Sequence, residues 1–142
     1  MKDGNELWHA LRQHIGSQTL FHHSLVKSFT YTEGVRDFAR NAGNGAYWLL
    51  DILATEPAVR GQVFQNGFAS AKLRVNADKR SGVLWVEDGN NGLVFEHVLD
   101  CTDCPAAPVK NFNPRGDWTF FIEPNQFENG SMVMTMMLPW ER

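Results

Sequence analysis

The sequence predicts an α+β protein in which N-terminal helices pack on one face of a four- to five-stranded antiparallel sheet. Two observations support this prediction. Apolar residues recur at helical spacing through the first third of the chain, and from residue 68 onward they alternate with polar residues. The glycine- and asparagine-rich segment Asp88–Gly92 lies between two apolar runs, as a hairpin turn would. We expect one domain over residues 1–142, mainly helical over 1–66 and antiparallel sheet over 67–142.

The first helix is predicted to begin after Asp3, because Asp3 and Glu6 have the spacing of a helix-capping pair. Gly16 is predicted to end it. The apolar residues between these two points follow helical spacing and are Leu7, Trp8, Leu11 and Ile15. Residues 17–31 lack clear periodicity, so we expect a loop or a turn of helix there.

Two more helices are predicted before residue 57. The second begins after Thr30 or Thr32, since either threonine can cap it, and Glu33 then lies at its positive end. The third covers residues 46–54 and is apolar nearly all round, which favours deep burial. Pro57 places the end of this third helix close to residue 55.

Five strands are predicted after the helices, over residues 69–77, 83–86, 93–99, 118–123 and 132–138. On the third of these, alternation places four side chains on one face, namely Leu93, Phe95, His97 and Leu99. On the last, Met132, Met134 and Met136 share a face, which is typical of a soft core and leaves an adaptable binding surface as the alternative. Residues 102–117 are expected to form an irregular connection.

The composition is that of a folded chain. The 142 residues are 43% hydrophobic and 20% charged, which is too apolar for a disordered protein. No apolar run approaches the ~18 residues of a membrane span, and residues 1–6 lack the apolar core of a secretory signal. The two cysteines exclude a disulfide framework and fit a reducing cytoplasm, where we expect this protein.

Charge is distributed unevenly along the chain. Residues 1–80 contain ten Lys and Arg against seven Asp and Glu, whereas residues 81–142 contain three against nine. An acidic half favours a basic protein partner over nucleic acid. The residues expected to contact such a partner are Glu87, Asp88, Glu96, Asp117 and Glu123; the alternative is that they form a solvated sheet face.

Asp51 is the most unusual polar residue, since it lies within the apolar run Trp48–Leu53. A carboxylate buried there needs an ion pair or hydrogen bonds. We expect a structural role, with backbone groups or with one of the arginines Arg36, Arg40 and Arg60. The functional alternative pairs Asp51 with Glu33 as an acid/base or metal-binding dyad.

No motif predicts a catalytic residue, a cofactor or a metal ion. The sequence lacks a phosphate-binding glycine loop, a dinucleotide fingerprint and a nucleophile elbow. The segment His97, Cys101 and Cys104 contains metal-ligand residue types. However, an extended chain places His97 about 13 Å from Cys101 at ~3.3 Å per residue, whereas ligands of one zinc ion lie about 4 Å apart. We therefore expect two reduced, partly buried thiols.

Five short motifs occur in a fixed order, at residues 31–35, 46–51, 87–89, 102–105 and 138–141. As a set they resemble an uncharacterised domain family found in proteins of bacterial mobile elements, plasmids and phages. The resemblance covers roughly residues 29–142 and leaves the first helix outside. In the turn Thr102–Pro105, Cys104 stands where the family has phenylalanine, which implies an apolar packing position next to the polar candidate Asp103. The resemblance brings no known activity and therefore no catalytic residues.

These observations predict a non-enzymatic module of mobile-element type that binds another protein, such as an inhibitor of a host defence complex of the CRISPR kind. One alternative is a small enzyme or nuclease-like domain that uses Asp51, Glu33 and a histidine. The other is a nucleic-acid-binding accessory protein whose basic residues are Arg36, Arg40, Arg60, Lys72 and Arg74. No membrane partner is expected.

Overall fold

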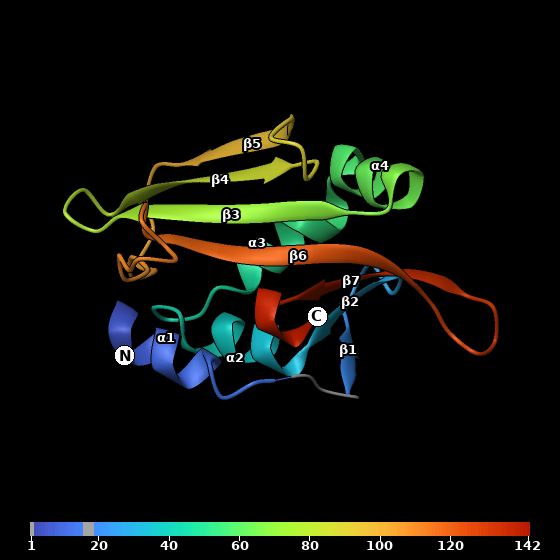
Figure 1. The fold of residues 1–142 in the computed structure, drawn as a ribbon, viewed down its shortest axis with the longest axis horizontal. Coiled ribbons are helices and arrows are strands. Elements are labelled where there is room, and N and C mark those ends of the chain that lie inside the picture. The colour runs from blue at the N-terminus through green and yellow to red at the C-terminus, as the bar shows by residue number, and fades with distance from the viewer. Residues whose placement is uncertain (1, 16–18) are drawn as a thin grey trace.

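A seven-stranded sheet with the order β1-β2-β7-β6-β3-β4-β5 runs through the molecule (Figure 1). The computed structural model describes residues 2–15 and 19–142. In this part of the chain the strands are β1 (Leu20–His22), β2 (Phe29–Thr32), β3 (Ala69–Asn76), β4 (Ser81–Glu87), β5 (Leu93–Leu99), β6 (Asp117–Gln126) and β7 (Met132–Met137). The helices are α1 (Gly4–Leu11), α2 (Glu33–Asn41), α3 (Tyr47–Thr55), α4 (Pro57–Asn66) and the short 3-10 helix η1 (Pro139–Glu141).

The α+β class is confirmed, but the prediction of a four- to five-stranded antiparallel sheet that follows all the helices is wrong. The sheet is mixed, because β2 pairs with β7 in parallel, with Phe29 opposite Met134. The two additional strands, β1 and β2, form within residues 19–32, in the half expected to be mainly helical. Residues 29–32 alternate aromatic residues with threonines and so suit a strand. Their partner lies about a hundred residues further along, beyond the reach of local pattern analysis.

The first helix is shorter than expected. Asp3 caps it as predicted, since its carboxylate accepts a hydrogen bond from the Glu6 N–H at 2.8 Å. The helix ends at Leu11, where the chain turns so that the His14 ring lies 3.0 Å from Asp37 on α2. Ile15, expected on the buried face, is 83% exposed. The predicted stop at Gly16 lies outside the described residues.

The remaining helix boundaries are set by caps and a proline. The Thr32 hydroxyl caps α2, whereas Thr30 lies within β2. Helix α3 ends at Thr55, as Pro57 predicts. The same proline then begins α4, a helix that periodicity does not reveal. Its start combines a proline in the first turn with a Glu56 side-chain cap, and Gly67 ends it at a φ of +82°.

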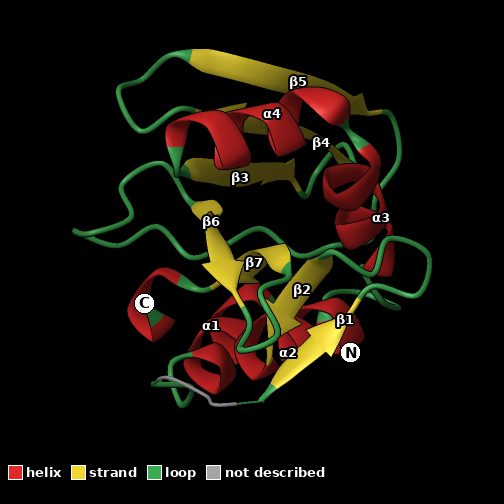
Figure 2. Cartoon of the chain, turned by 90° about the vertical axis from the view of Figure 1, so that its right-hand side faces the viewer, coloured by secondary structure: helices red, strands yellow, loops and turns green. Residues whose placement is uncertain are grey.

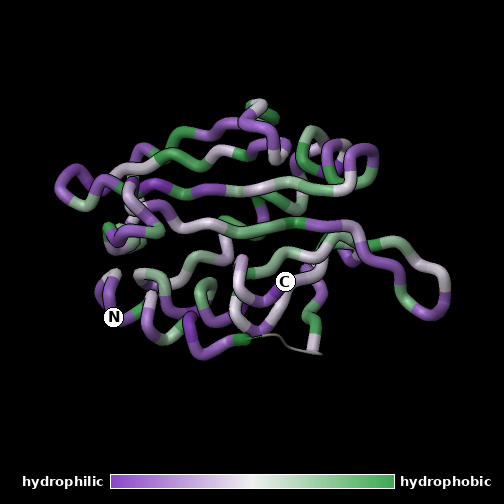
Figure 3. Tube along the Cα trace, viewed as in Figure 1, coloured by the Kyte–Doolittle hydropathy of each residue, from purple (hydrophilic) through white to green (hydrophobic). Residues whose placement is uncertain are grey.

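One hydrophobic cluster joins the helices to one face of the sheet. Helix α4 contacts β3, β5, β6 and β7, and α2 contacts β1, β2 and β7 (Figure 2). The middle of β6 is hydrophobic, and the β3–β4 turn is mostly hydrophilic (Figure 3). Met134 and Met136 are fully buried, which confirms the core interpretation for them, while Met132 is half exposed. No helix in residues 2–15 and 19–142 has the length and apolar character needed to cross a membrane.

The hairpin at Asp88–Gly92 is confirmed. The Asp88 N–H donates to the Gly92 carbonyl at 3.0 Å, and Gly89 and Asn91 supply the positive φ angles of 92° and 66°. A bulge next to this turn pairs Glu87 with Leu93 but Val86 with Phe95. Leu93 therefore leaves the face that it was expected to share with Phe95 and is 63% exposed.

Candidate binding site

Several polar motif residues hold distant segments together. The Glu141 carboxylate accepts hydrogen bonds from the Thr32 hydroxyl at 2.6 Å, the Leu138 N–H at 2.9 Å and the Gly34 N–H at 3.2 Å. A Cβ on Gly34 would lie 2.6 Å from both Glu141 Oε1 and a Leu138 methyl carbon. The motifs at residues 31–35 and 138–141 thus meet at the start of α2, where a carboxylate also suits the helix dipole.

The candidate Asp103 has a similar structural role. Its carboxylate accepts a hydrogen bond from the Asn44 N–H at 2.8 Å and lies against Gly43, whose φ is +60°. It therefore fixes the turn between α2 and α3. The neighbouring Cys104 is 4% exposed, as the resemblance implies for an apolar packing position. Burial and the nearby Asp103 charge raise the pKa of the Cys104 thiol to about 12.

The expectation that Asp51 is buried and is held by backbone groups or an arginine is wrong. Its side chain is 67% exposed, because the solvent-facing side of α3 carries it, and its partner is His23. His23 Nε2 lies 2.7 Å from Asp51 Oδ1, while His23 Nδ1 accepts hydrogen bonds from the N–H groups of Leu25 and Val26. These two backbone donors require Nδ1 to be unprotonated, so the Nε2–H donates to Asp51. The contact fastens the β1–β2 connection to α3.

The structure does not bring Asp51 and Glu33 together as a dyad. Glu33 lines a separate hollow along α2 with His14, Arg36 and Asp37, among others. No hydrogen bond or ion pair joins Glu33 to Asp51 in residues 2–15 and 19–142. Within the same residues, no group of three His, Cys, Asp or Glu side chains is placed to hold a metal ion. His97 stacks on Phe95 in β5, and Cys101 is exposed.

Four of the five acidic candidates lie on the outer face of the sheet, which we define as the face opposite the helices. Three of these four have a cationic neighbour. Glu87 lies 3.5 Å from Lys72 Nζ, and Glu123 lies 2.5 Å from Arg142 Nε. Asp117 makes two hydrogen bonds to Arg74, at 2.7 and 3.0 Å, which raise the pKa of the arginine. The outer face is therefore charge-paired rather than uniformly acidic.

The other two acidic candidates differ from these three. Glu96 is exposed on β5, opposite Trp85, with no cation within ion-pair distance among the described residues. Asp88 belongs to the hairpin turn, where its Oδ1 accepts hydrogen bonds from the N–H groups of Asn90 at 2.7 Å and Gly92 at 2.9 Å. These bonds lower the pKa of the Asp88 carboxyl. Its role in the turn is structural.

The five basic candidates do not form one stripe. Lys72 and Arg74 lie on β3 and are paired with carboxylates of the two neighbouring strands, and Arg60 on α4 donates to the Ser28 hydroxyl at 2.7 Å. Arg36 lies 4.3 Å from the centroid of the Phe21 ring, next to Arg40 on α2. Phosphate contacts need cations that follow one path along a backbone. The dispersal of these five residues over three elements does not provide such a path.

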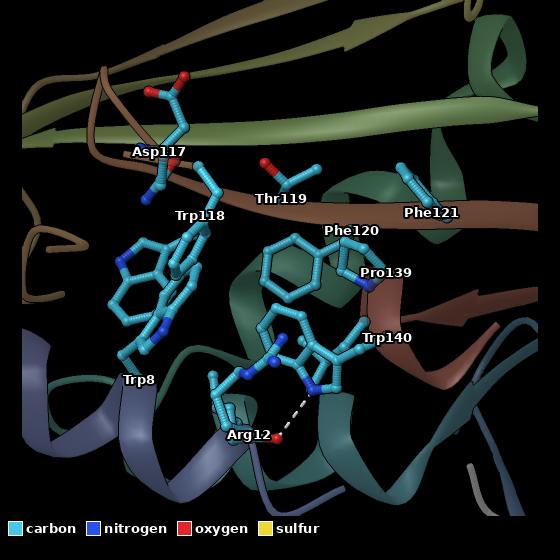
Figure 4. A pocket seen from close by; sticks show the side chains of 13 residues that line it. Trp8, Arg12, Asp117, Trp118, Thr119, Phe120, Phe121, Pro139 and Trp140 are labelled. Carbon is cyan, nitrogen blue, oxygen red and sulfur yellow. Dashed lines mark hydrogen bonds between the residues drawn. The ribbon is translucent and has the colours of Figure 1, made fainter. Parts of the chain in front are cut away.

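An aromatic pocket lies where α1, η1 and the first half of β6 meet (Figure 4). Its volume is about 260 Å³. Trp8 is central to it, because its ring centroid lies 5.4 Å from Trp140, 5.7 Å from Phe112 and 5.9 Å from Trp118. The pocket is open on one side, where Phe112 is 69% exposed. We call this hollow the aromatic pocket.

Polar contacts fix the walls of the aromatic pocket. The Trp140 indole N–H donates to the Leu11 carbonyl at 3.0 Å, and the Trp118 indole N–H donates to the Pro105 carbonyl at 2.7 Å. The guanidinium of Arg12 lies 4.6 Å from the Trp140 ring centroid, beside the pocket. No carboxylate of the described residues lies within ion-pair distance of Arg12. The pocket therefore combines rigid aromatic walls with an unneutralised positive charge.

Sequence reasoning missed this pocket. Its residues come from both ends of the chain, and the tryptophans gave no spacing that would link Trp8 to Trp140. The available signals were the five tryptophans in a chain of this length and the Leu138–Pro139 step, which predicts the end of a strand.

A model for a family of unknown function (DUF6876) matches residues 5–142. The match begins within α1, so it includes the first helix that the resemblance based on motifs leaves out. No curated protein and no solved structure matches the chain.

Proposed function

The chain belongs to this family of unknown function, and we propose that it is a non-enzymatic module that binds another protein through the aromatic pocket. The observation that supports the proposal is the pocket itself: tryptophan and phenylalanine walls, open to solvent, beside an arginine without a carboxylate partner. Tryptophan, tyrosine and arginine are the residues that dominate binding energy at protein interfaces.

Polar residues of the sequence motifs support the same proposal. Asp51, Asp103 and Glu141 are all engaged in contacts that hold segments of the fold together. These structural contacts explain why the three polar residues are present without requiring a catalytic role. As the partner we propose a protein of a bacterial defence complex in the cytoplasm, in keeping with the mobile-element setting that the motif resemblance implies.

The proposal is tested with two variants, each of which replaces an exposed apolar side chain by serine. Phe112→Ser removes an aromatic side chain from the pocket, and Leu93→Ser removes an equally exposed apolar side chain from β5, the edge of the sheet. Both positions are more than 60% exposed, so both variants are expected to fold. Each protein, with the wild type, is used to capture partners from the lysate of a bacterium that carries a CRISPR system.

We expect a stoichiometric partner with the wild type and with Leu93→Ser, and its loss with Phe112→Ser. A partner that is lost only with Leu93→Ser would contradict the pocket as the binding surface. The absence of a stoichiometric partner from all three captures would contradict the proposed function.

A further inference from the structure

Among the described residues, strand β6 has no strand partner on its β7 side where it borders the aromatic pocket, and we call this unpaired position the gap. Strands β6 and β7 pair from Gln126 and Met132 to Phe121 and Met137. Continuing this register by two residues would place Thr119 opposite Pro139. Pro139 has no N–H and begins η1, so β7 stops there. Between Asp117 and Phe120, β6 is therefore paired on one side only, with β3.

The main chain of Thr119 points into this gap. The Phe127 N–H donates to the Ser131 carbonyl at 3.0 Å, which extends the β6–β7 ladder beyond its last paired residues. Hydrogen-bonded pairs recur at every second residue of an antiparallel ladder, so the odd-numbered residues of β6 direct their N–H and C=O groups toward the β7 side. The odd-numbered Asp117 is consistent with this parity, because its N–H donates to the Asn113 side chain, which is not part of β3.

By this parity, Thr119 directs both its N–H and its C=O toward the pocket, and neither is hydrogen-bonded within the described residues. Residues from both faces of β6 line the pocket, for example Trp118 and Thr119, which places the pocket at the edge of the strand (Figure 4). A free N–H and C=O on one residue at a strand edge is the arrangement that an added strand uses.

We propose that the gap beside Thr119 binds an extended segment of the partner protein, with an aromatic and an acidic residue two positions apart. The inference rests on the proposed function and specifies its partner. The residue between these two would pair with Thr119 through two hydrogen bonds. In an extended chain its two neighbours point to the other face, which here is the face of Trp8 and Arg12.

The chemistry of the pocket selects this occupant. A volume of about 260 Å³ lies below the roughly 300–1,000 Å³ of small-molecule sites. It suits the aromatic side chain with its backbone, and the acidic side chain then lies toward Arg12, beside the pocket. The tryptophan and phenylalanine walls offer stacking surfaces for an aromatic ring of the partner segment. Arg12 lacks a carboxylate partner, so it favours an anionic side chain, which its planar guanidinium can bind with two hydrogen bonds.

The test uses synthetic five-residue peptides, acetylated and amidated, in which phenylalanine and aspartate flank a central threonine in either order. Binding of the tighter peptide to isotope-labelled protein is followed by NMR, together with hydrogen exchange of the Thr119 amide. We expect that amide to exchange fast in the free protein and to be protected in the complex. Methylation of the central peptide nitrogen should weaken binding about tenfold, because it removes one hydrogen bond and adds a clash.

The charge is tested with a matched pair of arginine variants. Arg12→Gln should weaken peptide binding about tenfold, and asparagine in place of the peptide aspartate should have no further effect in that variant. Arg36→Gln is the control, because Arg36 also lies over an aromatic ring but is not among the residues that line the pocket, and it should bind like the wild type.

Three results would overturn the inference: no peptide binding, binding that leaves Thr119 exchange unchanged, or phenylacetate binding as tightly as the peptide. The last would indicate a small-molecule pocket. None of these results changes the capture experiment with Phe112→Ser, so failure of the extended-segment inference is distinguishable from failure of the proposed function.

Discussion

The Glu141 carboxylate accepts a hydrogen bond from the Thr32 hydroxyl at 2.6 Å across 109 residues of sequence. The same carboxylate caps the Gly34 N–H at the start of α2 and the Leu138 N–H before η1. One side chain thus accepts from unpaired donors at the starts of two helices and joins the start of α2 to the C-terminal segment. Replacing it tests how strongly this contact stabilises the fold.

Glu141→Ala should lower the free energy of unfolding by about 1.5–3 kcal/mol, because three donors lose a charged acceptor. Urea unfolding measures the loss. Glu128→Ala, at the exposed tip of the β6–β7 hairpin, is the matched control and should change stability by less than about 0.5 kcal/mol. Equal effects of the two variants would contradict the structural role of Glu141.

Gly34→Ala should destabilise the protein by about 1–3 kcal/mol, since the added methyl group would overlap Glu141 and buried Leu138. Gly61→Ala in α4 is the counterpart, because nothing lies within 4 Å of its added Cβ. It should stabilise by about 0.5–1 kcal/mol through helix propensity. Thermal unfolding of both variants distinguishes the clash from any general effect of glycine replacement.

His23 should matter more for stability than its partner Asp51. Asp51→Ala removes an exposed carboxylate and should cost about 1 kcal/mol or less. His23→Ala removes a buried ring that packs against Phe29 and accepts two backbone hydrogen bonds, and should cost about 2–4 kcal/mol. A larger loss for Asp51→Ala in denaturant unfolding would contradict this order.

The Asp88 turn should make stability sensitive to acid. Hydrogen bonds from Asn90 and Gly92 lower the pKa of Asp88 in the folded state, so its contribution is present above the unfolded pKa and is lost as pH falls through the folded one. Asp88→Asn keeps an acceptor oxygen and removes the titration. Its free energy of unfolding should therefore fall less than that of the wild type between pH 5 and pH 2. The exposed Asp78→Asn should follow the wild type.

The two cysteines should differ in reactivity. The pKa of Cys104 is raised to about 12 by burial, so its thiol stays protonated and shielded at pH 8, whereas Cys101 is exposed. Iodoacetamide should modify one cysteine per native chain, located by peptide mass spectrometry at Cys101. Modification of Cys104 at the same rate in the native protein would contradict its burial. In urea both should react.

Local patterns predicted those parts of the fold that local contacts determine. The Asp3 and Thr32 caps, the end of α3 before Pro57 and the Asp88–Gly92 turn all rest on residues within a few positions of one another. The strands β1 and β2 were not predicted because each is short and because their link to the rest of the sheet is the long-range pairing of β2 with β7. The bulge at Leu93 was not predicted, because strict alternation of inward and outward side chains assumes an unbroken ladder.

The site was predicted only in part. The acidic residues of the second half were identified, and four of them do share a sheet face, but the cations that pair with three of these could not be placed without the register. Asp51 was noticed as a carboxylate among apolar neighbours, yet α3 turns it outward. The aromatic pocket depends on contacts between Trp8 and Trp140, which no local pattern connects.

The parallel pairing of β2 with β7 also has a consequence for the order in which the chain acquires its structure. The Thr30 hydroxyl donates to the Met134 carbonyl at 2.8 Å, across 104 residues. A nascent chain whose synthesis has not reached Met137 therefore has only β1 as a partner for β2 and lacks the strand that joins these two to the rest of the sheet. Helix α2, whose first turn is capped by Glu141, also lacks part of its N-terminal support. Closing this loop of about a hundred residues costs conformational entropy before the β2–β7 pairing can stabilise the fold, and this cost slows folding. The first segments emerge early from the ribosome but are fixed in place among the last.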